Sequence, residues 1–307
     1  MKGFIKKMKY KIAITPSSFA QTSKKPMELL SNKFKQISLN TYGRRLSKAE
    51  TLEILNECDG VIAGLEKYDE EVFSQCPKLK VISRVGIGID NIDLNAAKKH
   101  NIKVLNTPDE PAFAVAEMTF SVLMNCIKNI SYFNNNTHKK IWQKKINKSL
   151  KDMNIFLIGY GRIGNEFHKL LKPFSPNVTF FDPAFEDDKS FLELKDGIKN
   201  ADVISIHANT KKVILDKDTF KYMNTGVIIL NPSRDINVDK DELLKYVDKK
   251  IISYAWFDAF ENEPYDGKLV GKKNIILTPH ISTYTDVCRR TMEVKAAENL
   301  LEILSGN

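Results

Sequence analysis

One segment, residues 154–182, constrains the fold more than any other part of the chain, and it reads NIFLIGYGRIGNEFHKLLKPFSPNVTFFD. A short apolar run from Ile155 to Ile158 predicts a buried strand, which leads directly into three glycines spaced G-x-G-x-x-G. A helical pattern follows, and a second apolar run over 178–181 ends at Asp182. A lone glycine motif is weak evidence. Strand, glycines, helix and acid in this order predict a dinucleotide-binding unit.

The three glycines of this motif have different physical tasks. Gly159 allows a tight turn, Gly161 lets the backbone approach a pyrophosphate, and Gly164 lets the helix pack close to the sheet. The N–H groups at the start of the following helix are free to bind phosphate. The other residues of this cofactor-binding loop are expected to be Tyr160, Arg162 and Ile163.

Asp182 stands where such units carry an acid that accepts hydrogen bonds from the adenosine ribose hydroxyls. A 2′-phosphate would meet a like charge there, and no arginine directly follows Asp182. We therefore expect NAD, rather than NADP, as the cofactor. The alternative is a glycine-bearing turn that binds no nucleotide, and the combination of strand, helix and acid argues against it.

The length of 307 residues suits two domains, and 42% hydrophobic residues suffice for sizeable cores. The net charge of +9 could indicate nucleic acid or an anionic surface as a partner. However, the lysines are scattered, without an arginine-rich run or interleaved aromatic residues. We interpret them as a solvated surface with no nucleic-acid or membrane partner, whose mild positive field helps to collect small anions.

The four cysteines predict neither disulfides nor a metal site, because none forms a C-x-x-C pair or has a ligand partner at useful spacing. They are typical of reduced cysteines in a cytoplasmic protein. The first residues are basic and then apolar, but the apolar part is too short for a signal peptide and reads as a first strand. No run approaches the ~20 apolar residues of a membrane span.

Strand-like and helix-like patterns alternate along the chain, which predicts parallel sheets. We expect an α/β fold of two doubly wound domains. Residues 1–105, completed by 284–307, are predicted to form a flavodoxin-like substrate-binding domain, and 106–283 a Rossmann domain that binds NAD. The strands are expected at 10–15, 36–39, 60–64, 80–83, 102–105, 155–158, 178–181, 202–206, 227–230, 252–257 and 275–277.

Several helices have recognisable start signals. Ser47 and Glu50 have the spacing of a capping box, and Asp93 is a predicted N-cap. A long apolar helix over 111–130 begins with a proline at its first position. It is expected to cross between the domains or to lie in a subunit interface, and an ordinary core helix is the alternative. The last helix, 285–305, is expected to return to the first domain.

Three residues beyond the glycine motif point to chemistry. Arg234 and His280 directly follow apolar strands, and Glu263 lies in the segment FDAFENEP. In open α/β sheets, ligands bind outside the carboxyl ends of the strands. An arginine offers forked donors to a carboxylate, and a histidine can give a proton to a carbonyl oxygen that receives a hydride. A neighbouring carboxylate orients the imidazole and favours its protonated form.

With these residues in place, the chain resembles the D-isomer-specific 2-hydroxyacid dehydrogenases over nearly its whole length. The closest subgroup resembles short 3-phosphoglycerate dehydrogenases without a C-terminal regulatory domain. Several motifs in the right order carry the resemblance. They are SRVGIGIDNIDLNAA (83–97), VLNTP (104–108), AVAE (114–117), IGYGRIG (158–164), LNPSRD (230–235), FDAFENEP (257–264) and TPHIS (278–282).

The resemblance implies an NAD-dependent oxidoreductase that interconverts a D-2-hydroxy acid and its 2-keto acid, as a cytoplasmic homodimer. It implies that Arg234 binds the substrate carboxylate and polarises the carbonyl, that His280 is the acid/base, and that Glu263 is its partner. Asp258 is implied to contact the nicotinamide carboxamide.

The resemblance also implies substrate contacts in the first domain. The loop Val85–Gly86–Ile87–Gly88 would offer backbone N–H groups to the substrate carboxylate, and Arg84 would face the substrate's far end, where it could hold a phosphate. Alternatively, Arg84 pairs with an acid such as Asp90. The substrate is therefore left open between 3-phosphoglycerate and an unphosphorylated acid, as in glyoxylate or hydroxypyruvate reductases. A non-catalytic NAD-sensing protein of the same fold is the alternative of another class.

The chain departs from the family pattern at several positions. The usual glycine after the catalytic arginine is Asp235, and an acid beside Arg234 can weaken its hold on an anionic substrate. Pro232 replaces a small residue. The segment 207–220 is about two residues shorter than usual and lacks a proline after His207.

Overall fold

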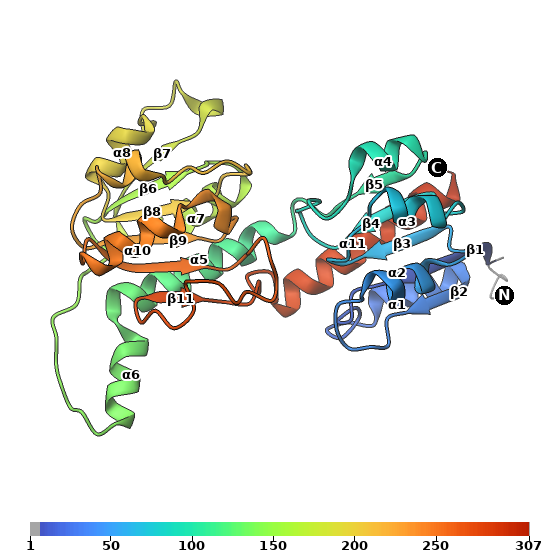
Figure 1. Cartoon of the computed structure of the whole chain (residues 1–307), viewed down its shortest axis with the longest axis horizontal. Coiled ribbons are helices and arrows are strands. Elements are labelled where there is room, and N and C mark those ends of the chain that lie inside the picture. The colour runs from blue at the N-terminus through green and yellow to red at the C-terminus, as the bar shows by residue number, and fades with distance from the viewer. Residues whose placement is uncertain (1–6, 307) are drawn as a thin grey trace. The chain divides into compact units, whose positions relative to one another are not determined.

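The computed structural model describes residues 7–306, which form two compact units (Figure 1). Unit 1 comprises the chain up to Pro111 together with Tyr284 onwards, and unit 2 spans Ala112–Thr283. The division at Pro111 lies six residues beyond the boundary at 105 that we expected from the sequence. That unit 1 binds the substrate and unit 2 binds the cofactor stays a prediction.

Unit 1 contains one five-stranded parallel sheet in the order β2-β1-β3-β4-β5, which is the flavodoxin-like order. The expected start signals are present: Ser47 and Glu50 form a capping box, and Asp93 caps the helix after it. The strands are β1 (Met8–Ile14), β2 (Phe34–Leu39), β3 (Gly60–Ala63), β4 (Val81–Arg84) and β5 (Lys103–Leu105). The intervening helices are α1 (Lys25–Lys33), α2 (Lys48–Leu55), α3 (Glu70–Gln75) and α4 (Leu94–Lys99).

The last helix, α11 (Asp286–Ser305), returns to unit 1 and packs on α1, β3 and β4, as predicted (Figure 1). It begins at Thr285, whose hydroxyl accepts a hydrogen bond from the N–H of Cys288. The packing is close: a Cβ on Gly60 would lie 3.2 Å from a methyl carbon of Leu304.

Unit 2 contains a six-stranded parallel sheet in the order β11-β10-β9-β8-β6-β7. A single parallel bridge between Phe180 and Phe191 stands beyond β7, where a Rossmann sheet has its third strand. The strands are β6 (Asn154–Ile158), β7 (Asn177–Phe181), β8 (Val203–Ile206), β9 (Val227–Asn231), β10 (Ile252–Phe257) and β11 (Ile275–Leu277). The helices that connect them are α7 (Arg162–Leu171), α8 (Leu194–Asn200), α9 (Lys217–Phe220) and α10 (Lys240–Asp248).

Hydrophobic cores cover both faces of this sheet, because successive strand residues point to opposite faces. In β6, Ile155 and Leu157 belong to one core, whereas Phe156 and Ile158 belong to the other. Burial on both faces explains why the sequence shows continuous apolar runs rather than alternation. Every strand predicted from the sequence is present, with ends that differ by at most two residues.

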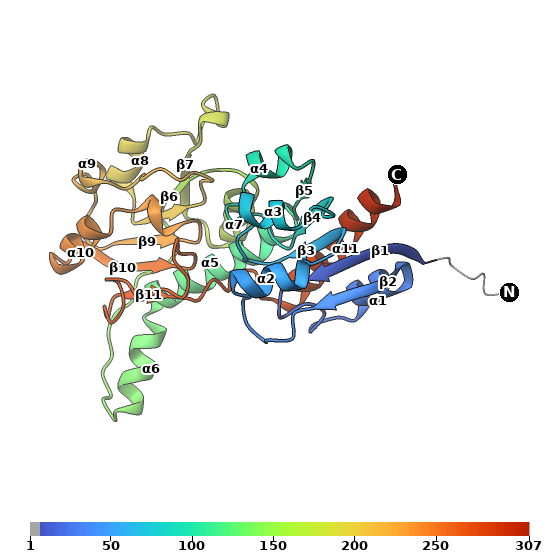
Figure 2. The same ribbon diagram turned by 45° about the vertical axis from the view of Figure 1, so that its right-hand side comes forward.

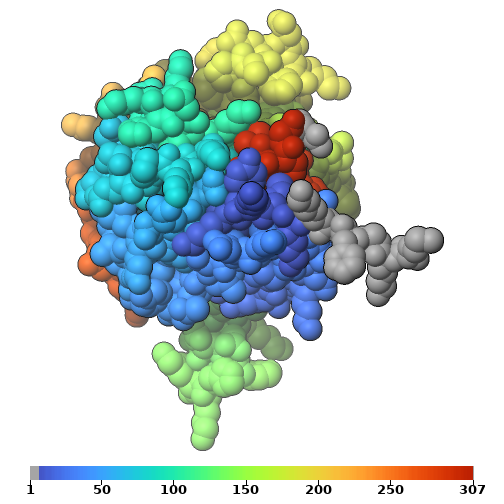
Figure 3. All heavy atoms as spheres, turned by 90° about the vertical axis from the view of Figure 1, so that its right-hand side faces the viewer, coloured from blue at the N-terminus to red at the C-terminus, as the bar shows by residue number. Residues whose placement is uncertain are grey.

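The apolar helix predicted over 111–130 differs from the structure at its end. Helix α5 (Pro111–Lys128) begins at the proline, as expected, but Asn129 adopts a left-handed backbone with φ 52° and α6 (Ile130–His138) follows. Helix α6 and the segment after it extend away from the sheet of unit 2 (Figure 2), and they protrude in the space-filling view (Figure 3, green). No described helix is long and apolar enough to cross a membrane.

Candidate active site

The predicted functional residues of unit 2 gather at one edge of its sheet. Since all six strands are parallel, their carboxyl ends meet at the same edge. Each functional segment directly follows a strand. These segments begin at Gly159 after β6, Asp182 after β7, His207 after β8, Pro232 after β9, Asp258 after β10 and Thr278 after β11.

The glycine loop has the geometry that a bound pyrophosphate needs. Gly159 has φ +96°, and a Cβ there would lie 2.8 Å from backbone atoms of His207 and Ala208. A Cβ on Gly164 would lie 2.3 Å from the carbonyl oxygen of Gly159. In contrast, a Cβ on Gly161 would meet no atom within 4 Å. The open space thus lies at the first turn of α7, where unsatisfied N–H groups point outward.

Asp182 is hydrogen-bonded to the glycine loop. Its Oδ2 accepts a hydrogen bond from the N–H of Tyr160 at 2.7 Å, and its Oδ1 accepts one from the N–H of Ala184 at 3.0 Å. Each carboxylate oxygen keeps acceptor capacity for a ribose hydroxyl. The ring of Tyr160 stacks on Phe180, with ring centroids 3.9 Å apart. The contact of Asp182, Arg162 and Ile163 with the cofactor stays a prediction.

His280 and Glu263 form a hydrogen-bonded pair. The Nδ1 of His280 lies 2.9 Å from Oε1 of Glu263, and the N–H of Phe260 donates to the same carboxylate oxygen at 3.0 Å. About a third of the His280 side chain is exposed. The carboxylate therefore occupies one ring nitrogen, so that Nε2 is the nitrogen available to a ligand.

Asp258 holds the turn that carries His280. Its Oδ1 accepts hydrogen bonds from the Thr278 hydroxyl and the Ile281 N–H, and its Oδ2 accepts one from the Ser282 N–H. His280 itself has a left-handed backbone with φ 54°, which an unsupported histidine rarely adopts. Asp258 is 1% exposed. It thus has a structural task that the sequence did not indicate, and its contact with nicotinamide stays a prediction.

Arg234 begins a short turn after β9, and its Nη1 donates to the carbonyl oxygen of Ser233 at 2.8 Å. The neighbouring Asp235 does not present a free negative charge, contrary to our concern from the sequence. Its carboxylate is 3% exposed and lies 2.7 Å from the ammonium group of Lys240. The ion pair neutralises the acid, and the sequence signal that would have shown this is a lysine at the start of the next helix.

The shortened segment 207–220 is fastened to the Arg234 turn through Asn237. The Asn237 amide donates to the carbonyl oxygens of Thr210 and Lys212, each at 2.9 Å.

His207 packs beneath the glycine loop, and burial lowers its pKa to about 3. Burial thus favours the neutral form of the His207 imidazole at neutral pH.

The substrate-binding residues predicted in unit 1 also follow a strand, β4. Arg84 is 8% exposed, and a Cβ on Gly86 would lie 2.6 Å from its Nη1. The N–H of Val85 donates to the carbonyl oxygen of Ala63, and the N–H of Gly86 donates to the Thr107 hydroxyl. These two N–H groups therefore have acceptors within the protein, and the contact of the loop with the substrate carboxylate stays a prediction.

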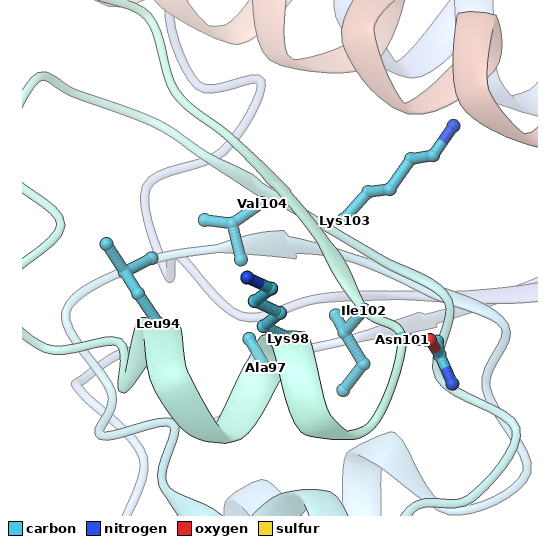
Figure 4. A pocket seen from close by; sticks show the side chains of 7 residues that line it. All are labelled: Leu94, Ala97, Lys98, Asn101, Ile102, Lys103 and Val104. Carbon is cyan, nitrogen blue, oxygen red and sulfur yellow. The ribbon is translucent and has the colours of Figure 1, made fainter.

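A hollow on unit 1 lies apart from this chemistry (Figure 4). It lies between α4 and β5, and its lining includes no carboxylate, histidine or aromatic side chain. The lining residues are Leu94, Ala97, Lys98, Asn101, Ile102, Lys103 and Val104. The hollow thus lacks the imidazole and carboxylate groups on which the predicted acid/base chemistry depends.

Metal and thiol chemistry have no support within residues 7–306. No group of three or more His, Cys, Asp or Glu side chains gathers there in a way that could hold a metal ion. The four cysteines are free and buried, and burial raises the pKa of each thiol. A thiolate nucleophile would need the opposite shift.

A doubly wound sheet, a glycine loop open at a helix N-terminus and an acid at the end of β7 define a dinucleotide-binding protein. Residues 120–282 match the family model described as "D-isomer specific 2-hydroxyacid dehydrogenase, NAD binding domain". The chain belongs to this family, as the motifs predicted. It is an NAD-dependent D-2-hydroxyacid dehydrogenase.

Relatives cover the chain to different extents. It is 31% identical to the hydroxypyruvate reductase of Thermotoga maritima, over 92% of this chain and 95% of that protein. It is 32% identical to the D-3-phosphoglycerate dehydrogenase of Methanocaldococcus jannaschii, over 85% of this chain but only 52% of that protein. The structure of the TT0316 protein from Thermus thermophilus superposes with a TM-score of 0.85, 26% identity and 97% coverage of each chain.

The glycine loop generates the first prediction. Gly161→Ala should leave the thermal stability of the protein without cofactor unchanged, because its φ of −70° suits alanine and the space is open. It should weaken NADH binding, because the methyl group occupies the space left for the pyrophosphate. Gly164→Ala should instead lower the melting temperature, since its Cβ meets backbone.

Thermal unfolding without cofactor and NADH fluorescence titration measure the two effects. Wild-type NADH affinity in Gly161→Ala would contradict the placement of the pyrophosphate at this turn.

Proposed function

We propose that this chain reduces a small 2-keto acid to the D-2-hydroxy acid with NADH, and catalyses the reverse reaction with NAD. The observation that carries the proposal is the 2.9 Å hydrogen bond between Nδ1 of His280 and Glu263 at the carboxyl edge of the sheet. It leaves Nε2 of His280 as a proton donor at the edge where the cofactor is expected.

The residues of unit 2 supply the remaining chemistry. Bound NADH supplies the hydride, and the carbonyl carbon of the 2-keto acid accepts it. His280 gives its Nε2 proton to the carbonyl oxygen, and the Glu263 carboxylate stabilises the imidazolium before the transfer. Arg234 is the proposed partner of the substrate carboxylate, because a guanidinium matches a carboxylate with two parallel N–H donors.

The fit of the cofactor rests on the glycine loop. The open space at Gly161, the first turn of α7 and the acceptor capacity left on Asp182 suit the pyrophosphate and the ribose of NAD. We propose that Tyr160, Arg162 and Ile163, which belong to the same loop, also contact NAD. Asp258 is proposed to contact the nicotinamide carboxamide through the acceptor capacity that remains on its Oδ2.

Between the two substrate classes, the proposal favours an unphosphorylated acid such as hydroxypyruvate. Arg84 is 8% exposed, and its guanidinium folds over its own loop at Gly86. A phosphate-binding arginine would need to extend its forked donors to the ligand.

A substrate panel tests this choice. We expect NADH oxidation with hydroxypyruvate or glyoxylate to have a higher kcat/KM than NADH oxidation with 3-phosphohydroxypyruvate, and 3-phosphoglycerate to be a poor substrate for NAD reduction. Arg84→Ala should raise KM for phosphorylated and unphosphorylated substrates alike. If Arg84→Ala raises KM for 3-phosphohydroxypyruvate selectively, the phosphorylated substrate is the correct one. If the wild type turns over no member of the panel, the NAD-sensing alternative gains support and the enzymatic proposal fails.

The acid/base pair generates a sharper prediction. His280→Ala should lower kcat by roughly 10²–10⁴-fold, the usual contribution of a positioned acid/base, without weakening NADH binding. Glu263→Gln keeps an oxygen acceptor for the Phe260 N–H but loses the charge. Imidazolium is then favoured less, so the pH–rate profile for reduction should move to lower pH. Stopped-flow and steady-state assays from about pH 5 to 9 measure both, and an unmoved profile would remove Glu263 from this role.

We also propose a cytoplasmic homodimer. The four free cysteines support a reducing compartment. Large apolar side chains on and after α6 are exposed, and Trp142 and Ile146 reach 83% and 96% exposure. Such a patch is typical of a protein interface, and we propose a second copy of the chain as its occupant.

Light scattering after size exclusion tests the dimer. The wild type should elute with twice the chain mass, and the double variant Trp142→Glu, Ile146→Glu with the mass of one chain. The variant should keep its melting temperature at low protein concentration, because neither side chain lies in a core. A wild type with the mass of one chain refutes the proposal.

A further inference from the structure

Asp235 joins three segments at the carboxyl edge of the unit 2 sheet. Its N–H donates to the carbonyl oxygen of Ala259 at 3.1 Å. Its Oδ1 accepts a hydrogen bond from the N–H of Glu261 at 2.9 Å, and its Oδ2 lies 2.7 Å from the ammonium group of Lys240. A carboxylate that is 3% exposed is costly unless it is paired, and the Glu261 N–H and Lys240 satisfy one oxygen each.

The segments that Asp235 joins are those that carry the proposed chemistry. Arg234 precedes it directly in the chain. Glu261 lies two residues before Glu263, in the same loop whose Phe260 N–H binds the Glu263 carboxylate at 3.0 Å. Glu263 in turn binds His280. A series of polar contacts thus leads from Lys240 through Asp235 and the Glu263 loop to the acid/base pair.

Asp235 contacts the middle of the loop between Asp258 and Pro264, where Phe260 also packs in a hydrophobic core. The loop lies outside the strands, so the ladder hydrogen bonds of β10 end at Phe257. The two hydrogen bonds to Asp235 are contacts that tie its middle to the turn after β9. Without the Asp235 carboxylate, the Glu261 N–H, two residues before Glu263, would lose its acceptor.

We propose that Asp235, neutralised by Lys240, is a positioning residue of the reaction, which holds the Glu263 loop against the Arg234 turn. This inference rests on the proposed function of the same site. Asp235 touches neither substrate nor cofactor in this proposal. It acts through Glu263, which must lie within hydrogen-bonding distance of His280 to favour the imidazolium.

Two variants of Asp235 separate the hydrogen bond from the charge. Asp235→Ala removes the acceptor for the Glu261 N–H, whereas Asp235→Asn keeps an oxygen acceptor there. For Asp235→Ala we expect kcat for 2-keto acid reduction to fall by about 10-fold, since displaced catalytic groups cost up to ~10²-fold. The pH–rate profile should move to lower pH. Asp235→Asn should recover most of both effects, and NADH affinity should be unchanged in both.

Asp241 offers a matched control, because it forms a second Asp–Lys pair with Lys268 at the surface of the same unit. Asp241→Ala should leave kcat and the pH–rate profile unchanged. A shift of equal size in Asp241→Ala would show that general charge removal is responsible and would overturn the proposal. Asp235→Ala with wild-type kcat and profile, or Asp235→Asn as impaired as Asp235→Ala, would overturn it too.

If Asp235→Ala fails to fold, Asp235→Gly replaces it, because it removes the same acceptor from the Glu261 N–H. An unmoved pH–rate profile in a folded Asp235→Gly would then refute the proposal.

The titration of the His280 ring, followed by nuclear magnetic resonance, gives a readout that needs no turnover. Its midpoint should lie at lower pH in Asp235→Ala than in the wild type and Asp235→Asn. If the wild type turns over no substrate, the proposed function fails, yet a lower midpoint still supports the positioning role. An unmoved midpoint overturns that role whatever the activity.

Discussion

The parallel direction of the six strands in unit 2 is the constraint on which the rest of the site depends. Because every strand ends at the same edge, each strand-end loop delivers its first residues to one place, although the loops are far apart in the sequence. The Gly159 turn, the Asp182 acid, Arg234, Glu263 and His280 thus gather without any need for sequence proximity. The cores on both faces of the sheet fix the strands, and the loops carry the chemistry.

Acidic side chains at this edge show how the loops themselves are held. Asp182, Asp235 and Asp258 each accept hydrogen bonds from backbone N–H groups of loops that the sheet cannot reach. Three carboxylates at one edge would repel an anionic substrate if they were unpaired. Hydrogen bonds from N–H groups, and the ammonium group of Lys240, stabilise this negative charge locally. The loops therefore gain rigidity from these acids, and the cation beside Asp235 reduces its repulsion of an anionic substrate.

The sequence predicted the strands, the capping box and the glycine turn because each depends on local pattern. Apolar runs identified the strands of unit 2, and Ser47 with Glu50 identified a helix start. The break at Asn129 was missed because the prediction followed the apolar pattern, whereas the local signal is the asparagine itself, which tolerates the left-handed region. The engaged N–H groups of Val85 and Gly86 were missed for a different reason: their acceptors, Ala63 and Thr107, lie 21 to 22 residues away in the sequence.

The partners of the Asp235 carboxylate are the contacts that the sequence motif could least predict. Judged as a departure from the family pattern, an acid in place of glycine beside Arg234 was expected to compete with the substrate for the guanidinium. In the structure, one carboxylate oxygen of Asp235 accepts a hydrogen bond from the Glu261 N–H, and the other pairs with Lys240. A glycine at this position could not make either contact. Because a buried aspartate without a cation would be strongly unfavourable, the two residues are coupled: we expect the acid to be tolerated only where the helix after it begins with a base.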